Sequence, residues 1–203
     1  MTRLRSITVY CSSSPHLEGH FAETAGRLAR AIAARGATLV YGGGGIGLMG
    51  VIARSAKAAG ARVEGIITEK FLALEQGWDG CDEMVVVSTM RERKRQLAER
   101  ADAFVILPGG LGTFEEFFEI LVARQIGDHH RPIGIVNDRG YYDPMLALID
   151  HSIEHRFVKA RMRALLHVHP DPEEVLSLCE REAREGRAAA EYDPQRFLPM
   201  GDL

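Results

Sequence analysis

The sequence is poor in cysteine and lacks the features of secreted and membrane proteins. Its three cysteines, Cys11, Cys81 and Cys179, are far apart and form no Cys-x-x-Cys pair. An odd number of cysteines without metal-ligand spacing is typical of reduced thiols in the cytoplasm. No apolar run is long enough to cross a bilayer, and the first residues show no signal-peptide core. We therefore expect a cytoplasmic protein that does not bind membranes.

An excess of charge of one sign is also absent. The chain of 203 residues has 25 Lys and Arg against 28 Asp and Glu, which gives a formal net charge of −3. This near balance gives no reason to expect binding to nucleic acid. No acidic cluster has metal-site spacing, so we expect no metal. Gly-x-Ser-x-Gly and Gly-Lys-Ser/Thr motifs are missing, which disfavours a serine hydrolase and a P-loop NTPase.

Short apolar runs alternate with amphipathic segments along the chain. Strands are predicted over residues 6–10, 38–41, 62–68, 83–88, 103–107, 132–136 and 165–168. Helices are predicted between most of them, while a loop is expected around Glu75. The pattern predicts an α/β fold, a Rossmann-like, doubly wound, mostly parallel sheet with helices on both faces. We expect a single domain over residues 1–185 and a loosely ordered C-terminal tail over 186–203.

Three loops follow predicted strands directly and contain small residues. They are Cys11–Pro15, Gly42–Gly47 and Pro108–Thr113. In a parallel sheet the carboxyl ends of the strands lie at one edge, and ligands bind there at a topological switch point. We therefore expect the three loops to converge on a ligand site.

The loop Pro108–Thr113 leads into a predicted helix that begins near Phe114. Unpaired N–H groups and the positive end of a helix dipole make such a junction a natural seat for a phosphate. The Thr113 hydroxyl adds a donor, and Glu116 supplies a carboxylate in the same turn. The alternative is a capping box, in which Thr113 and Glu116 only satisfy the helix N-terminus. The sequence leaves both open.

The glycine run after the second predicted strand has three interpretations. Gly42-x-Gly44-x-x-Gly47 matches the dinucleotide fingerprint, and Glu69 follows at roughly the spacing of its ribose-binding acid. The glycines could instead only allow a helix and a strand to pack closely. We favour a loop that faces a nucleotide or sugar.

The segment Met90–Lys94 begins a strongly basic helix. Arg93 and Lys94 flank the apolar face of this helix, within reach of a neighbouring loop at a strand end. The alternative is a solvated basic surface with pairs such as Arg95 to Glu99.

Together these segments resemble a known family. Pro108-Gly-Gly-Leu-Gly-Thr-Phe-Glu-Glu116 matches the PGGxGTxxE motif of the Lonely Guy family, the cytokinin-activating phosphoribohydrolases. Met90-Arg-Glu-Arg-Lys94 is similar to the family's MHxRK motif, although Arg91 replaces the usual His. The glycine run through Gly50 and the segment Cys11-Ser12-Ser13 also resemble the family pattern. The resemblance covers roughly residues 7–150.

The resemblance implies hydrolysis of the N-glycosidic bond of a nucleoside 5′-monophosphate, typically an N6-substituted AMP, to a free base and ribose 5-phosphate. It also implies a homodimer or larger assembly and no cofactor. Arg93 and Glu116 are the implied catalytic residues. Implied substrate-binding residues are Gly43, Gly44, Glu75, Met90, Lys94, Gly109, Gly110, Gly112, Thr113 and Glu115.

Two other functional classes remain open on the sequence. One is a non-catalytic nucleotide or cofactor carrier of the same fold, and the other is a nicotinamide oxidoreductase. Family members have often been labelled lysine decarboxylases. That activity is disfavoured because the four lysines, Lys57, Lys70, Lys94 and Lys159, lie in no recognisable pyridoxal-binding motif.

Overall fold

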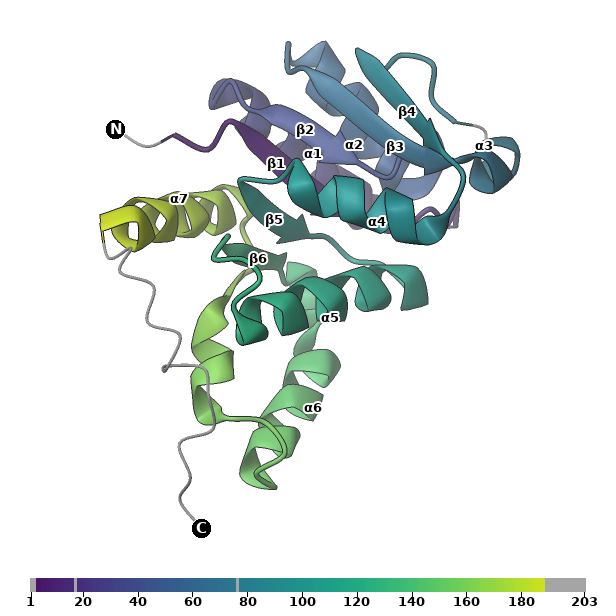
Figure 1. The fold of residues 1–203 in the computed structure, drawn as a ribbon. Helices are drawn as coiled ribbons and strands as arrows, with labels where there is room; N and C mark the ends of the chain where they lie inside the picture. The colour runs from purple at the N-terminus through teal and green to yellow at the C-terminus, as the bar shows by residue number, and fades with distance from the viewer. Residues whose placement is uncertain (1–2, 17, 76, 189–203) are drawn as a thin grey trace.

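The computed structural model describes residues 3–16, 18–75 and 77–188. Within these residues, seven strands form one sheet in the order β4-β3-β2-β1-β5-β6-β7, and every neighbouring pair is parallel (Figure 1). The strands are β1 (Ser6–Tyr10), β2 (Thr38–Tyr41), β3 (Val63–Thr68), β4 (Glu83–Val87), β5 (Ala103–Ile106), β6 (Ile133–Val136) and β7 (Leu166–His169). The predicted α/β class is confirmed, with a sheet that is parallel throughout.

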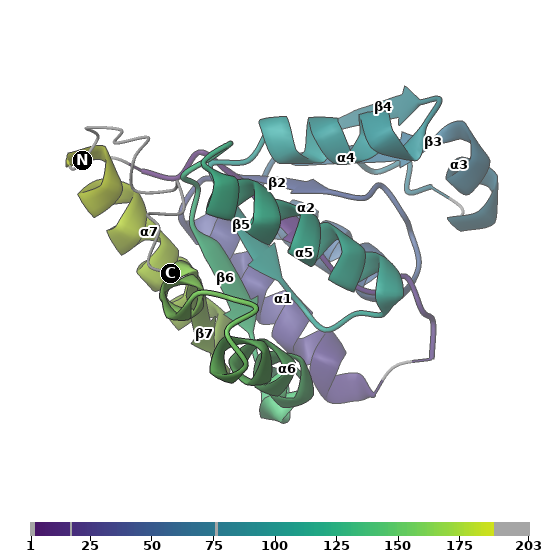
Figure 2. The ribbon, with the colours of Figure 1, turned by 60° about the horizontal axis from the view of Figure 1, so that its bottom comes forward.

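Helices cover both faces of the sheet. They are α1 (Gly19–Ala34), α2 (Gly47–Ala58), α3 (Glu69–Glu75), α4 (Met90–Glu99), α5 (Leu111–Ile126), α6 (Asp143–Glu154) and α7 (Pro172–Ala188). Helices α1, α2 and α7 pack on one face, and α4, α5 and α6 pack on the other, so that a separate apolar core lies on each side (Figures 1 and 2). None of the described helices is long and apolar enough to cross a membrane.

Burial explains why the strands read as continuous apolar runs. Strands β5 and β6 are buried at every position because helices cover both of their faces. The flanking helices bury only one stripe. In α1 this stripe includes Ala25, Leu28 and Ile32, which are fully buried at the predicted spacing of three and four residues.

The winding of the chain brings the three predicted loops together. Strands β1 and β5 are neighbours, and the chain proceeds outward from them in opposite directions, which creates the switch point. The Ser12 N–H donates to the Pro108 carbonyl at 3.2 Å, and the Met49 N–H donates to the Ser12 carbonyl at 3.2 Å. Gly47 has a φ of 60°, and a Cβ there would meet the backbone of Ser13 and Ser14. The expected convergence is confirmed.

Several element boundaries differ from the prediction. Helix α5 begins at Leu111 rather than near Phe114, because Gly110 takes the N-cap position with an extended backbone. Glu75 ends the short helix α3 instead of lying in a loop. A 3₁₀ helix over Ala160–Leu165 was not anticipated, since 3₁₀ turns have weak sequence signals. Helix α7 continues to Ala188, and residues 189–203 of the predicted tail lie outside the described residues.

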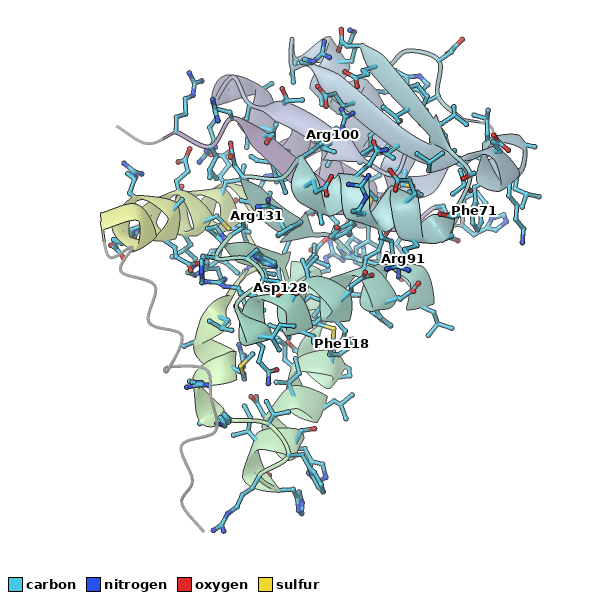
Figure 3. All side chains as sticks on the ribbon, in the orientation of Figure 1. Phe71, Arg91, Arg100, Phe118, Asp128 and Arg131 are labelled. Atoms are coloured by element: carbon cyan, nitrogen blue, oxygen red, sulfur yellow. The ribbon has the colours of Figure 1, made fainter. Side chains whose placement is uncertain are left out.

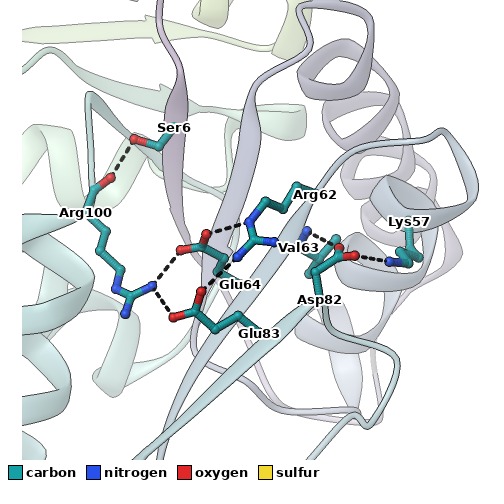
Figure 4. Close-up of polar contacts among 8 residues, drawn as sticks. All are labelled: Ser6, Lys57, Arg62, Val63, Glu64, Asp82, Glu83 and Arg100. Carbon is teal, nitrogen blue, oxygen red and sulfur yellow. Dashed lines mark hydrogen bonds and ion pairs between the residues drawn. The ribbon is translucent and has the colours of Figure 1, made fainter.

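An ion-pair network joins β3, β4 and α4 at the amino ends of the strands (Figure 4). Arg100 Nη1 lies 2.7 Å from Glu64 and 2.9 Å from Glu83, and Arg62 pairs with the same two carboxylates. Burial alone would raise the pKa of Glu64, but hydrogen bonds from Arg62 and Arg100 outweigh it and lower this pKa. The network fastens the C-terminal end of α4 to the sheet, at the opposite end from the converging loops.

Candidate active site

Arg93 is a buried cation at the carboxyl edge of the sheet. Only 5% of the residue is exposed, and all three guanidinium nitrogens have partners. Nε donates to the Ile66 carbonyl at 3.0 Å, Nη2 to the Gly42 carbonyl at 3.1 Å, and Nη1 to Glu116 Oε1 at 3.3 Å. Both carbonyls lie just beyond the last β2–β3 pair, Tyr41 with Gly65. The guanidinium therefore occupies the gap that opens where β2 ends.

Gly42 makes room for this guanidinium. A Cβ at residue 42 would collide with Arg93 Nη2 and would also press on the Met49 side chain. Gly43 has a φ of 79°, which favours glycine, and its carbonyl accepts from the Trp78 N–H at 3.1 Å. At these two positions the glycine run serves close packing of the backbone.

Glu116 lies one turn into α5 and is only 7% exposed. Its carboxylate faces Arg93, and the buried ion pair joins α5 to α4. The alternative of a capping box is wrong, because the N-cap is Gly110 and Thr113 is the third residue of the helix. Glu116 is therefore too far along α5 to reach back to the N-cap. A buried carboxylate needs a partner of opposite charge, and Arg93 provides it.

The start of α5 forms an open anion cradle, which we define as the backbone N–H groups of residues 110–113. No side chain caps Gly110, and Cβ atoms at Gly110 and Gly112 would meet only open space. The first N–H groups of a helix have no intrahelical partner. Gly112 and Glu116 are four residues apart, so the Glu116 α-carbon lies about 6 Å further along the helix axis than the Gly112 α-carbon, on the same side of the helix.

Gly109 and Thr113 pack against each other on the buried side of the cradle. Gly109 is buried, and its α-carbon lies against the Thr113 side chain, which is 4% exposed. A Cβ at Gly109 would collide with Thr113 Oγ1. The predicted residues Gly109, Gly110, Gly112 and Thr113 are thus brought together.

Lys94 connects two carboxylates of α5. Its Nζ lies 2.8 Å from Glu115 and 2.8 Å from Glu119. Hydrogen bonds to Glu115 and Glu119 raise the pKa of Lys94. Lys94 therefore stays protonated and holds α4 against α5. Glu119 was not anticipated, although its spacing of four from Glu115 was a usable signal.

A cavity of about 110 Å³ lies between α4 and α5, and Glu116 forms part of its wall. Tyr10 and His129 line it together with Lys94 and Glu119. Burial, and then the nearby Glu116 and Glu119 charges, raise the pKa of Tyr10 well above its ordinary value. Burial also lowers the pKa of His129 to about 4. Both side chains are therefore neutral near pH 7, and neither was predicted from the sequence.

The other predicted residues lie around this centre. Met90 is the first residue of α4 and is partly buried, and Arg91 is exposed in the same turn (Figure 3). Gly44 is buried beside Gly43. Glu75 ends α3, which directly follows β3 at the same edge of the sheet. The structure thus places Met90 and the glycine run near Arg93 and leaves the role of Glu75 a prediction.

Histidine and acidic side chains form no metal-binding group of three or more in the part of the chain that the structure describes. The sequence does contain a His-x-x-x-His pair, which the expectation of no metal overlooked. His151 and His155 lie four residues apart at the end of α6, with ring centroids 4.4 Å apart. Both are exposed and remote from the cradle, so the pair is not part of the site.

Replacing Gly42 by Ala is expected to destabilise the protein by roughly 2–4 kcal/mol, because the new methyl group displaces the buried Arg93 guanidinium from its partners. Gly110→Ala is the matched control, since its methyl group enters open space, and it is expected to keep nearly full stability. Thermal and urea unfolding of both variants would measure the difference. Equal stability of the two variants would contradict the steric role of Gly42.

A family model described as "Possible lysine decarboxylase" matches residues 49–179 of the chain. Among solved structures, a molybdenum cofactor carrier protein from Chlamydomonas reinhardtii shares the fold. It has a TM-score of 0.67 and 20% identity, over 90% of this chain and 99% of that chain. The likeness supports the Rossmann-like architecture.

Curated relatives are considerably closer in sequence. The chain is 41% identical to cytokinin riboside 5′-monophosphate phosphoribohydrolase of Rhodococcoides fascians, over 83% of this chain and 86% of that protein. It is 38% identical to cytokinin riboside 5′-monophosphate phosphoribohydrolase LOG2 of Arabidopsis thaliana, over 88% of this chain and 84% of that protein. With the motifs assembled in one site, the chain belongs to the Lonely Guy family of cytokinin riboside 5′-monophosphate phosphoribohydrolases.

Proposed function

We propose that the protein hydrolyses the N-glycosidic bond of a nucleoside 5′-monophosphate, typically an N6-substituted AMP. The products are the free base and ribose 5-phosphate. The observation that carries the proposal is the buried Arg93–Glu116 pair one helical turn below an open anion cradle. The names of relatives at 38% and 41% identity support the same substrate class.

The 5′-phosphate binds at the cradle. The N–H groups of Gly110, Leu111, Gly112 and Thr113 and the helix dipole stabilise its negative charge. Gly110 and Gly112 leave space for the phosphate oxygens because they carry no side chain. The ribose then extends along α5 toward Glu116.

Glu116 acts on the ribose. As the bond between C1′ and the base nitrogen breaks, the bonding electron pair leaves with the base and positive charge builds on the ribose. An ionised carboxylate beside C1′ stabilises this oxocarbenium-like state, and it either activates water or attacks C1′ itself. Water finally supplies the hydroxyl group on C1′ and a proton for the base.

Arg93 holds Glu116 in place through their buried ion pair. Arg93 also orients the nucleotide and assists the departing base. Lys94 supports binding through its ion pair with Glu115, which contacts the ribose hydroxyls. Glu75, Met90, Gly43 and Gly44 complete the nucleotide pocket in this proposal.

Lysine decarboxylation is disfavoured by the raised pKa of Lys94. A Schiff-base lysine needs a lowered pKa to act as a nucleophile, whereas two carboxylates raise the pKa of Lys94. Lys57 is likewise paired with Asp82 at 2.5 Å, far from the cradle. The label of the family model therefore does not describe the chemistry that this site supports.

A non-catalytic carrier is the second candidate, because the fold is shared with the molybdenum cofactor carrier. A carrier needs the cradle but not a buried carboxylate below it. A nicotinamide oxidoreductase is a weaker candidate, since the glycine run packs backbones and accommodates Arg93. Release of a free base separates the proposed hydrolase from both.

We also propose that the protein is a cytoplasmic homodimer that binds no nucleic acid. The outward face of α5 supports the dimer. It presents an apolar stripe of Leu111 (85% exposed), Phe118 (36%; Figure 3), Val122 (51%) and Ile126 (59%). An apolar face of this kind is typical of a protein interface. Because α5 also carries Glu116, such a dimer would brace the catalytic helix.

A double substitution, Val122→Lys with Ile126→Lys, is expected to convert the dimer to a monomer, because two charges would be buried at the interface. Phe157→Ser is the control, since Phe157 is 88% exposed but lies outside α5. Sedimentation velocity would measure the assembly. A wild-type monomer, or a dimer that survives the double substitution, would contradict this use of α5.

Incubation with AMP and with N6-isopentenyl-AMP, followed by chromatography, is expected to show free base from the wild-type protein. Glu116→Gln should lower the rate by about 10²-fold or more, because the neutral amide cannot stabilise the positive charge on the ribose. Glu99→Gln, an exposed carboxylate paired with Arg95 on α4, is the control and should keep full activity.

Circular dichroism would check that Glu116→Gln is folded. Nucleotide binding by this variant without turnover would separate loss of chemistry from loss of the site. Full activity of Glu116→Gln would reduce Glu116 to a structural partner of Arg93. Binding of AMP by the wild type with no release of base would favour the carrier.

A further inference from the structure

Three successive carbonyl groups in the loop after β5 are held by other parts of the chain. Their hydrogen bonds come to Leu107 from the Tyr142 hydroxyl at 2.7 Å, to Pro108 from the Ser12 N–H at 3.2 Å, and to Gly109 from the Tyr141 hydroxyl at 2.8 Å. Each of these three peptide units is therefore fixed through its oxygen.

The bond to Gly109 has a consequence for the cradle. A trans peptide unit is planar, so the Gly109 carbonyl and the Gly110 N–H point in opposite directions. A peptide between two glycines can rotate with little steric resistance, because neither residue has a side chain. The Tyr141 hydroxyl removes this freedom, since it holds the carbonyl on one side and thereby aims the N–H to the other.

A hydrogen-bonded turn after β6 positions the Tyr141 ring. Asn137 accepts from the Tyr142 N–H at 2.8 Å and donates to Asp143 at 2.7 Å. Two left-handed residues, Arg139 with a φ of 50° and Gly140 with a φ of 76°, tighten the turn between them. This turn directly follows the strand beside β5, so the hydroxyl reaches the loop without a flexible connection.

Aromatic packing fixes the ring itself. Tyr141 makes an edge contact with Phe21 at a centroid distance of 5.6 Å and another with Tyr142 at 5.0 Å. The two tyrosines differ in burial, since Tyr142 is 1% exposed and Tyr141 is 39% exposed. Tyr142 is thus part of the core, whereas Tyr141→Phe is expected to fold, because Tyr141 is partly exposed and the substitution keeps the ring.

We propose that Tyr141 is a positioning residue for the phosphate of the substrate. Its hydroxyl holds the Gly109 carbonyl so that the Gly110 N–H faces the bound phosphate. In this way Tyr141 sets the preference for a phosphorylated nucleotide over the corresponding nucleoside. The inference rests on the proposed function, because it assigns the phosphate to the same cradle.

The test is Tyr141→Phe in the full chain, which deletes one hydroxyl and keeps the ring. Calorimetric titration with inorganic phosphate is expected to show a dissociation constant raised about fivefold, because the Gly110 N–H is no longer held toward the phosphate. The affinity for adenine and the melting temperature should stay unchanged. In the base-release assay KM for AMP should rise similarly, with kcat within about twofold of wild type.

Ser152→Ala is the matched control, since it deletes another hydroxyl that donates to a carbonyl, that of Leu148 in α6. It should change neither phosphate nor adenine binding. Unchanged phosphate affinity in Tyr141→Phe, or equal loss of phosphate and adenine affinity, would overturn the inference and leave the proposed hydrolysis intact. A wild-type protein that binds phosphate but releases no base would instead refute the proposed function, while the titration would still decide the role of Tyr141.

Discussion

The buried Arg93 guanidinium is the interaction on which the rest of the site depends. Removing a charge from water is costly, and hydrogen bonds together with an opposite charge must offset that cost. Arg93 satisfies this condition with two backbone carbonyls and one carboxylate, contributed by the segments after β2, in β3 and in α5. The requirement dictates a glycine at residue 42 and places Glu116 against the end of the sheet. A single side chain of α4 thereby sets the geometry of α5.

The first two turns of α5 have different environments. The first turn, with Gly110 and Gly112, is exposed and open, so its N–H groups remain available to an anion. One turn further, Glu116 is buried and paired with Arg93. Lys94 adds a second connection between α4 and α5 at the surface. The proposed hydrolysis uses both turns at once, with the phosphate above and the scissile bond below.

Much of this arrangement follows from local sequence. The apolar runs predict the strands, and small residues after three of them predict converging loops, because parallel strands end at one edge. Other features depend on contacts between distant residues. Arg93 lies in a basic segment that reads as solvated, and only partners 23 to 51 residues away make its burial possible. The helix start was misplaced because Gly110 caps α5 without a side chain. Tyr10 and Tyr141 were not predicted, since single aromatic residues form no motif.

The central claim is that the cradle and the Arg93–Glu116 pair form one site for the sugar phosphate. A crystal structure with ribose 5-phosphate bound tests it most directly. The account predicts the phosphate on the N–H groups of residues 110–113 and the C1 atom of the sugar in contact with the Glu116 carboxylate. A phosphate bound instead at the glycine run 42–47, or a sugar turned away from Glu116, would contradict it.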